Sequence, residues 1–309
     1  MGRNGYIGSP ADLHRVNDFN YDQNQDRGPL NALALAYSGF PLVYPDIVGG
    51  TFGENRFDVS VTPRMKTYIM RNAQWASVHP SMSMGQGPWT FEDEQVERVM
   101  LEAAQLHDRL HPYFFSQAIR FYRDGYPWTM TPLPIAFPED EKAHGRENDR
   151  VRGYQWMIGD SLMAVPLYGN DYETAASRDV YLPAGTWIDY DTGERYQGPK
   201  LLKDFPLPVG KTPLFAGGTG VVIEKVQSGD SQRSPLHAAL AGRFYPVASE
   251  GQTEFWDSSG DRRSIITVRV RDPKNPEVFD QTTGNPVEGK WVRHAWQFPF
   301  EAGHNYEIR

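Results

Sequence analysis

The sequence predicts a parallel α/β region followed by all-β domains. Strand-like and helix-like runs alternate over roughly the first 130 residues, which is typical of parallel α/β arrangements. Beyond about residue 140 the runs become short and β-rich, and Gly and Pro separate them, as in antiparallel sandwiches. The chain has 309 residues. At roughly 100–200 residues per domain, this length suggests two or three domains.

The first elements are expected to alternate between strand and helix. Residues 13–19 and 40–47 are short strand-like runs with polar residues near their ends, and we expect each to form a strand. Between them, residues 26–39 fit a helix with Gly39 just past its end. Residues 63–76 fit a second helix. The pattern indicates two strand–helix units in the first quarter of the chain.

A third and longer helix is expected to follow. Thr90 and Asp93 have the spacing of a capping box, which predicts its start. Its apolar positions recur every three or four residues and predict one buried face, made of Val96, Val99, Ala103, Leu106 and Leu110. Pro112 should kink or split this helix, because proline lacks an N–H and clashes with the preceding turn.

Changes in composition divide the chain into three domains. The charged connection 138–150 ends an α/β domain predicted over residues 1–140 and leads into a β-sandwich domain over 141–225. The polar stretch 226–235 opens a distal β-rich domain over 226–309. In this last domain apolar and polar residues alternate and predict one buried face, with Ile266, Val268 and Val270 alternating with Thr267 and Arg269.

Composition and charge exclude several classes of function. The net charge of −8 argues against nucleic acid and anionic membrane surfaces as partners. The absence of cysteine excludes a disulfide framework, a thiolate nucleophile and a Cys-ligated metal. No apolar run reaches the ~20 residues of a membrane span, and the first residues have no signal-peptide pattern. The chain is therefore expected to be soluble, with its compartment left open.

Two carboxylates follow the first predicted strands. Asp18 ends the first strand-like run and Asp46 ends the second. Sites of parallel α/β folds form at the carboxyl ends of strands, so these two residues are candidates for one cleft. Alternatively, each Asp caps the helix or turn that follows it. A metal site built from both carboxylates with His14 or His79 is a further alternative, although no HExxH or HxH spacing supports it.

Seven motifs occur in order along the chain: "RNGYIGSP", "VNDFN", "SGFPLVYPDIVGG", "MRNAQWASVHPSM", "HDRLHPYFFSQA", "IGDSLMAVPL" and "RDVYLPAGTWIDYDTGERY". Together they resemble glycoside hydrolase family 31, the α-glucosidase and α-galactosidase family. The similarity covers about residues 3–222. "YPDIVGG" and "HPSMSMGQGPW" are most similar to the branch that contains the myogenesis-regulating glycosidase.

The resemblance implies a retaining α-glycosidase that acts on oligosaccharides or other α-glycosides. The implied fold is the C-terminal part of a (β/α)8 TIM barrel followed by two β-sandwich domains. Asp18 falls at the position of the acid/base, and Arg3 and Asp46 at positions that bind sugar hydroxyls. Trp75 and Trp89 are candidates for the walls of the sugar site. Neither a cofactor nor a metal is expected.

Other positions match a structural motif of the family or depart from its pattern. Arg71 and Gln74 match a helix motif whose role is expected to be structural. Ser83 and Gly85 stand where the family often has Arg and His, and Arg15 stands in place of the usual Trp. These departures affect the expected identity of the substrate, without removing the expected chemistry.

The nucleophile of the family is expected to be absent from the chain. Retaining hydrolysis needs a nucleophile and an acid/base about 5–5.5 Å apart, and the family's nucleophile strand precedes the motif that contains Arg3. A whole barrel takes ~250 residues, whereas only ~130 precede the β domains. The resemblance therefore implies a fragment that is inactive alone and that needs a complementary N-terminal barrel fragment. A direct Asp18–Asp46 pair with inverting geometry is the alternative within the chain.

The sequence is also compatible with a second class of function, in which the chain resembles the family but binds carbohydrate without catalysis. The β domains and the 40 aromatic residues, 16 Tyr, 16 Phe and 8 Trp, would suit a carbohydrate-binding or scaffolding remnant. Trp256, Trp291 and Trp296 of the last domain could form a stacking platform, although core packing is the expected role.

Overall fold

The computed structural model describes residues 13–16, 24–49, 62–144, 154–226 and 239–309. Its N-terminal part consists of helices and very short strands, where β1 pairs with β2 and β3 with β4, both in parallel. These elements are β1 (His14–Arg15), α1 (Arg27–Tyr37), β2 (Val43–Tyr44), β3 (Ile47–Val48), α2 (Pro63–Ala76), β4 (Ser83–Met84), η1 (Pro88–Phe91) and α3 (Glu94–Asp124). The described residues assemble no closed eight-stranded barrel, so the expected barrel portion is not confirmed.

Helices α1 and α2 lie where the sequence predicts them. After α1 the chain turns at Gly39, whose φ of 85° is in the left-handed region that glycine adopts without steric cost. At the start of α2, Thr62 is the N-cap, and its hydroxyl accepts the N–H of Met65 at 3.3 Å. Both ends therefore have a local cause that can be read from the sequence.

Helix α3 begins later than the capping-box spacing predicts. Its N-cap is Asp93, whose carboxylate accepts the N–H groups of Gln95 and Val96 at 2.9 and 3.2 Å. Thr90 lies instead in η1. Glu92 between them has a φ of 46°, in the left-handed region, so the backbone cannot continue as one helix from Thr90. The expected capping box is therefore wrong.

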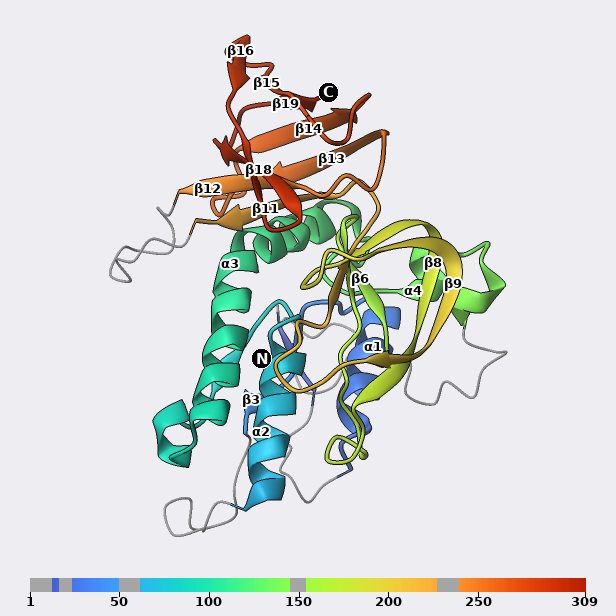
Figure 1. Ribbon diagram of the computed structural model, residues 1–309, viewed down its shortest axis with the longest axis vertical. Helices are drawn as coiled ribbons and strands as arrows, with labels where there is room; N and C mark the ends of the chain where they lie inside the picture. The colour runs from blue at the N-terminus through green and yellow to red at the C-terminus, as the bar shows by residue number, and fades with distance from the viewer. Residues whose placement is uncertain (1–12, 17–23, 50–61, 145–153, 227–238) are drawn as a thin grey trace.

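Pro112 lies inside α3 and does not split it. Figure 1 shows that the helix changes direction along its length, as expected where an internal proline removes a backbone hydrogen bond. The predicted apolar stripe is buried and packs on α2, and the C-terminal half of α3 contacts the last domain. No helix in the described part of the chain is long and apolar enough to cross a bilayer.

A six-stranded antiparallel sheet forms the middle of the chain. Its order is β5-β6-β7-β10-β8-β9, so β5 and β9 are its edges. Trp156 and Ile158 face the helices, while Met157 between them faces a second apolar cluster, as the two-residue period of a strand requires. The strands are β5 (Thr131–Pro132), β6 (Trp156–Ile158), β7 (Leu162–Ala164), β8 (Ser177–Asp189), β9 (Arg195–Pro206) and β10 (Leu214–Ala216), with α4 (Leu133–Ala136) and η2 (Glu141–His144) beside them.

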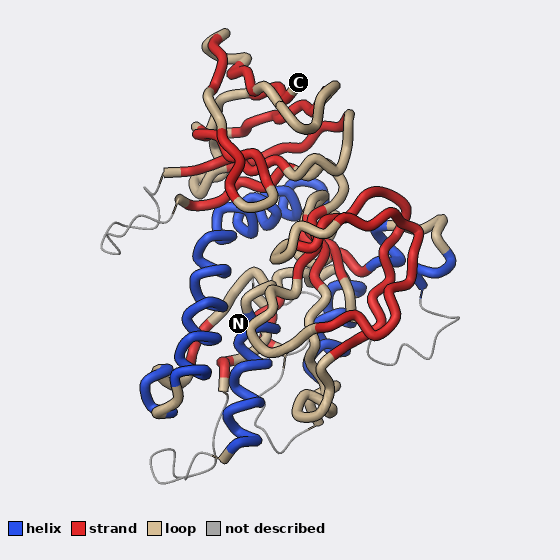
Figure 2. The backbone as a smooth tube through the Cα atoms, in the orientation of Figure 1, coloured by secondary structure: helices blue, strands red, loops and turns tan. Residues whose placement is uncertain are grey.

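Two further sheets, of four and five strands, face each other across one apolar core in the last domain. Figure 2 shows the strands gathered at the top and right of the molecule and most of the helical chain below and to the left. Ile266, Val268 and Val270 point into this core as predicted. The strands are β11 (Val221–Lys225), β12 (Leu240–Phe244), β13 (Glu250–Trp256), β14 (Arg263–Arg269), β15 (Val278–Asp280), β16 (Asn285–Val287), β17 (Lys290–Val292), β18 (Ala295–Phe300) and β19 (Tyr306–Ile308).

Strand pairing places both domain boundaries earlier than the sequence predicts. β5 was expected in the α/β domain, but it pairs with β6 in the middle sheet. β11 was expected in the proximal domain, but it pairs with β12 in the distal sandwich. Both strands pair with partners that lie beyond a charged or polar connection. Composition alone therefore assigns each strand to the domain before its connection, whereas its pairing assigns it to the domain after it.

Buried ion pairs join α3 to both β domains. Glu224 of β11 is 3% exposed and accepts the Tyr190 hydroxyl at 2.9 Å. The arginines Arg109 and Arg243 lie 3.6 and 3.4 Å from the same carboxylate. Further along α3, Arg120 lies 3.2 Å from Asp160 and 3.4 Å from Glu254. Because the Glu224 carboxylate is shielded from water, it needs its cationic partners in place, whereas Asp160 and Glu254 remain partly exposed.

Trp75 of α2 lies in the core. Its side chain has no exposed surface, and its ring stacks on Tyr168 with 4.6 Å between centroids and 2° between planes. The other candidate tryptophan, Trp89 in η1, is 72% exposed. The two residues were expected to share a role in a sugar site, but their surroundings are opposite.

This contrast gives a stability prediction. Trp75→Ala should lower the free energy of unfolding by about 3–5 kcal/mol, because it removes a large buried ring and leaves a cavity. Trp89→Ala is the matched control and should change it by less than about 0.5 kcal/mol. Urea unfolding followed by circular dichroism measures both values. Equal effects of the two substitutions would contradict the core position of Trp75.

Two neighbouring histidines lie between the helices and the middle sheet, His79 fully buried and His107 of α3 partly exposed. His79 packs against Trp75 and Trp156, with ring centroids 4.8 and 5.1 Å apart, and its Nδ1 lies 2.8 Å from the Trp75 carbonyl oxygen. Burial lowers the pKa of His79 to about 3 and that of His107 to about 4. Both imidazoles are therefore neutral in the folded chain at neutral pH.

These pKa values predict a loss of stability in mild acid. Below about pH 6.5 the unfolded chain binds protons at both histidines while the folded chain does not, so unfolding becomes more favourable as pH falls toward 4. From about pH 7 to about pH 5.5, the free energy of unfolding should fall by about 1 kcal/mol less in His107→Gln than in the parent chain. His144→Gln, at an exposed position, should retain the parent pH dependence. Urea unfolding at the two pH values measures the difference.

Candidate functional site

Arg15 and Asp46 form an ion pair at the carboxyl ends of β1 and β2. The Nε of Arg15 donates to Oδ1 of Asp46 at 2.7 Å, and its Nη2 donates to the same oxygen. Asp46 is 3% exposed. The parallel pairing of His14 with Val43 sets the register that brings the two side chains together. The structure therefore places a carboxylate and a guanidinium at the edge where α/β folds form their sites.

The backbone at Asp46 is in an unfavourable conformation. Its φ is 92°, in a region that non-glycine residues rarely adopt. Strain of this kind persists only where the surroundings impose it, and it is concentrated at functional sites. The ion pair with Arg15 is one contact that holds the residue in place. The strain is thus an independent observation in favour of a functional role for Asp46.

A chain of hydrogen bonds supports the segment that follows Asp46. The N–H of Gly49 donates to Oδ1 of Asn72 on α2 at 3.1 Å, and Nδ2 of Asn72 donates to the Tyr168 hydroxyl at 2.9 Å. That hydroxyl donates in turn to Gln25 at 2.7 Å. Burial raises the pKa of Tyr168 well above its usual value, so the phenol remains a donor. The end of β3 is therefore fixed to α2 and to the middle sheet.

Two residues that differ from the family pattern make contacts at or next to this site. Arg15, in place of the usual Trp, pairs with Asp46. Ser83, in place of the usual Arg, hydrogen-bonds through its hydroxyl to Tyr44 of β2. Both residues have polar partners on neighbouring strands. The sequence shows the departures, but only the fold shows that they are built into the same strand ends.

The remaining predicted residues fall in different places. Arg3 and Asp18 lie outside the described residues. Trp75 is buried in the core and Trp89 is exposed, so the structure does not bring the two rings together. Arg71 and Gln74 have the structural role that was expected of them, because Arg71 donates to the carbonyl of Leu207 at 2.6 Å and Gln74 to that of Lys211 at 2.6 Å.

The alternative metal site gains no support from the described part of the chain. No group of three or more His, Asp or Glu side chains there is arranged to hold a metal ion. His14 is 3% exposed and packs on Phe40, with ring centroids 4.5 Å apart. His79 is enclosed by aromatic rings. Both imidazoles therefore have packing roles.

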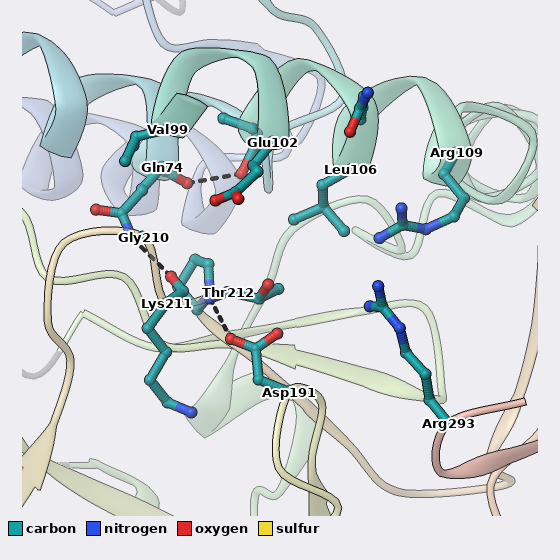
Figure 3. Close-up of a pocket in the computed structure, with 14 residues that line it drawn as sticks. Gln74, Val99, Glu102, Leu106, Arg109, Asp191, Gly210, Lys211, Thr212 and Arg293 are labelled. Carbon is teal, nitrogen blue, oxygen red and sulfur yellow. Dashed lines mark hydrogen bonds between the residues drawn. The ribbon is translucent and has the colours of Figure 1, made fainter. Parts of the chain in front are cut away.

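The sequence does not predict a cavity of about 350 Å³ that lies between the helices and both β domains. Figure 3 shows its lining: Gln74 comes from α2, Glu102 and Arg109 from α3, Asp191 from the turn between β8 and β9, and Arg293 from the last domain. These residues are up to about 200 positions apart, so no local motif signals them. Among the described residues predicted for the sugar site, Asp46, Trp75 and Trp89 do not line this cavity.

The sequence is similar to a known domain family and to several known glycosidases. Residues 125–222 match the model of the glycosyl hydrolase family 31 C-terminal domain. The myogenesis-regulating glycosidase of Mus musculus is 29% identical over 187 residues, which cover 59% of this chain and 24% of that protein. Alpha-glucosidase 2 of Bacillus thermoamyloliquefaciens is 26% identical over 231 residues, or 72% of this chain and 27% of that protein. The chain thus spans about a quarter of the length of these two relatives.

Solved structures show the same relationship. A family 31 α-xylosidase from Xanthomonas citri superposes with a TM-score of 0.65 at 25% identity, over 80% of this chain and 27% of that one. A family 31 dextranase from Flavobacterium johnsoniae, solved with glucose, gives a TM-score of 0.69 over 93% of this chain and 42% of that one. Its 17% identity shows the fold alone. By sequence and fold, the chain is similar to glycoside hydrolase family 31, and residues 125–222 match the model of the C-terminal domain of that family.

Proposed function

We propose that the chain takes part in the retaining hydrolysis of terminal α-linked glucose or galactose, with Asp18 as the acid/base. Relatives of the chain are glycosidases, among them an α-glucosidase. The observation that carries the proposal is the strained, buried Asp46 paired with Arg15 at the carboxyl ends of two parallel strands. In this proposal Asp46 and Arg3 bind sugar hydroxyls next to Asp18.

The proposed reaction needs two carboxylates. A nucleophile attacks the anomeric carbon while the acid/base protonates the leaving oxygen, and water then releases the sugar with the same residue acting as base. Asp18 fills the second of these roles. The nucleophile comes from a barrel strand that belongs to the additional length of the relatives, so we propose that a complementary N-terminal barrel fragment completes the site. The 309-residue chain by itself then catalyses no hydrolysis.

The ion pair at Asp46 bears on the choice of substrate. An aspartate beside a sugar subsite offers two acceptor oxygens to hydroxyl groups. Here one of them, Oδ1, already accepts both donors from Arg15. The pairing compensates the negative charge and fixes the orientation of the carboxylate. We therefore propose that the Arg15–Asp46 pair narrows the range of sugars that fit, compared with a site that has Trp at position 15.

Carbohydrate binding without catalysis is the second candidate function. The observation that favours it is the indole of Trp89, which is 72% exposed. An exposed indole offers an apolar face to a sugar ring. Trp291, which is 42% exposed in the last domain, offers another. In this case the chain binds oligosaccharides and hydrolyses none.

The catalytic proposal is tested by complementation. The chain is co-expressed with the N-terminal barrel segment of a family 31 α-glucosidase, and hydrolysis of aryl α-glucosides and α-galactosides is measured. Asp18→Asn should lower kcat/KM by about 10²–10⁴-fold for a leaving group that needs a proton. The loss should be smaller for a strongly acidic leaving group, because its departure needs little protonation.

Asp22→Asn, a few residues along the same segment, is the matched control and should leave turnover unchanged. Turnover by the chain alone that is lost in Asp18→Asn would contradict the need for a second fragment. Oligosaccharide binding by calorimetry with no turnover in any complemented sample would favour the second candidate.

A further inference from the structure

The cavity of Figure 3 has an excess of positive charge at one end. Arg109 of α3 and Arg293, in the turn between β17 and β18, both line it, and Figure 3 shows their guanidinium groups directed into the same space. Arg109 shares the carboxylate of Glu224 with Arg243. Among the described residues no carboxylate lies within ion-pair distance of Arg293. Three guanidinium groups therefore have one carboxylate among them.

The cavity also has two acidic residues, and Figure 3 shows Glu102 away from the two guanidinium groups and Asp191 between Lys211 and Arg293. Glu102 projects from α3 one and two helical turns before Leu106 and Arg109, and Asp191 accepts the N–H of Thr212 at 2.6 Å. Lys211 contributes no further charge, because it pairs with the buried Asp189 at 2.7 Å. The lining thus offers two cationic donors at one end and carboxylate acceptors elsewhere along the cavity.

The structure holds Arg293 in position at some cost. Its φ is 54°, in the left-handed region where glycine or asparagine is favoured. The next residue, His294, anchors the turn to the middle sheet, since its Nε2 lies 3.0 Å from the Asp191 carbonyl oxygen. Gly193 leaves room for this contact, because a Cβ there would lie 2.2 Å from Nδ1 of His294. An arginine kept in a strained and anchored turn over a cavity is an indication of function.

We propose that this cavity binds a small oxyanion-bearing polar ligand, whose phosphate- or carboxylate-type group lies between Arg109 and Arg293. Planar guanidinium groups bind such anions through paired, charge-assisted hydrogen bonds. The carboxylates of Glu102 and Asp191 accept hydrogen bonds from hydroxyl groups on the rest of the ligand. A cavity of about 350 Å³ suits a ligand the size of one sugar phosphate or sugar acid. The site is separate from the proposed sugar subsite and does not depend on glycosidase activity.

Calorimetric titration of the 309-residue chain tests the proposal. The probes are inorganic phosphate, glucose 6-phosphate, glucuronate and glucose, each at an ionic strength matched with sodium chloride. Arg293→Asn removes the charge and keeps a residue that tolerates the left-handed conformation. It should weaken anion binding by about tenfold or more, the effect of losing one charge-assisted hydrogen bond. Arg109→Gln should weaken it to a similar extent.

Arg271→Asn removes an exposed arginine elsewhere on the last domain and should leave binding unchanged. Near-ultraviolet circular dichroism without added anion shows whether each variant is folded. Tighter binding of glucose 6-phosphate or glucuronate than of phosphate assigns a sugar-borne anion, and equal binding assigns the free anion. Binding that Arg293→Asn leaves unchanged, or no binding of any anion to the parent chain, overturns the proposal.

Discussion

The arrangement of the β domains around α3 depends on ion pairs between arginines of this helix and carboxylates of the two domains. Glu224 and Asp160 belong to different β structures, and each is paired with an arginine of the same helix. Glu224 is 3% exposed, so the loss of its arginine partners would leave a charge in a poorly solvated place, at a cost of about 3–5 kcal/mol. The helix therefore fixes the middle sheet and the distal sandwich relative to each other. The cavity lined by Arg109 and Arg293 exists because of this arrangement.

Much of the local structure follows from sequence pattern. The alternation at Ile266, Val268 and Val270 predicts the buried face of β14 and the residue that follows it, and residues 63–76 predict α2 to the residue. These features have short-range causes. The domain boundaries are different, because β5 and β11 are assigned by hydrogen bonds to strands about 15 to 25 residues away. Pairing of this kind depends on the tertiary fold and leaves no mark in composition.

In the candidate site too, some features follow from the local sequence and others depend on the tertiary fold. The position of Asp46 after a strand-like run predicts that it lies at the carboxyl end of a parallel strand. The ion pair with Arg15, however, depends on the register of β1 against β2. Trp75 lies in a helix motif that gives no sign of burial, and its stacking on Tyr168 joins residues 93 positions apart. The similarity to glycoside hydrolase family 31, in contrast, can be predicted from ordered motifs, and the family model matches residues 125–222. The sequence thus predicts the family resemblance more readily than the contacts around the candidate site.

The long strand β9 has a consequence for association between molecules. It pairs only with β8 among the described strands, so one row of its backbone groups has no neighbour in the sheet. Free edges of this length invite a strand from another copy. Pro199 and Pro206 interrupt the row of amide donors, and Lys200 and Lys203 add like charges that would repel an identical strand. The outer margin of the middle sheet is therefore built to resist growth into a continuous intermolecular sheet.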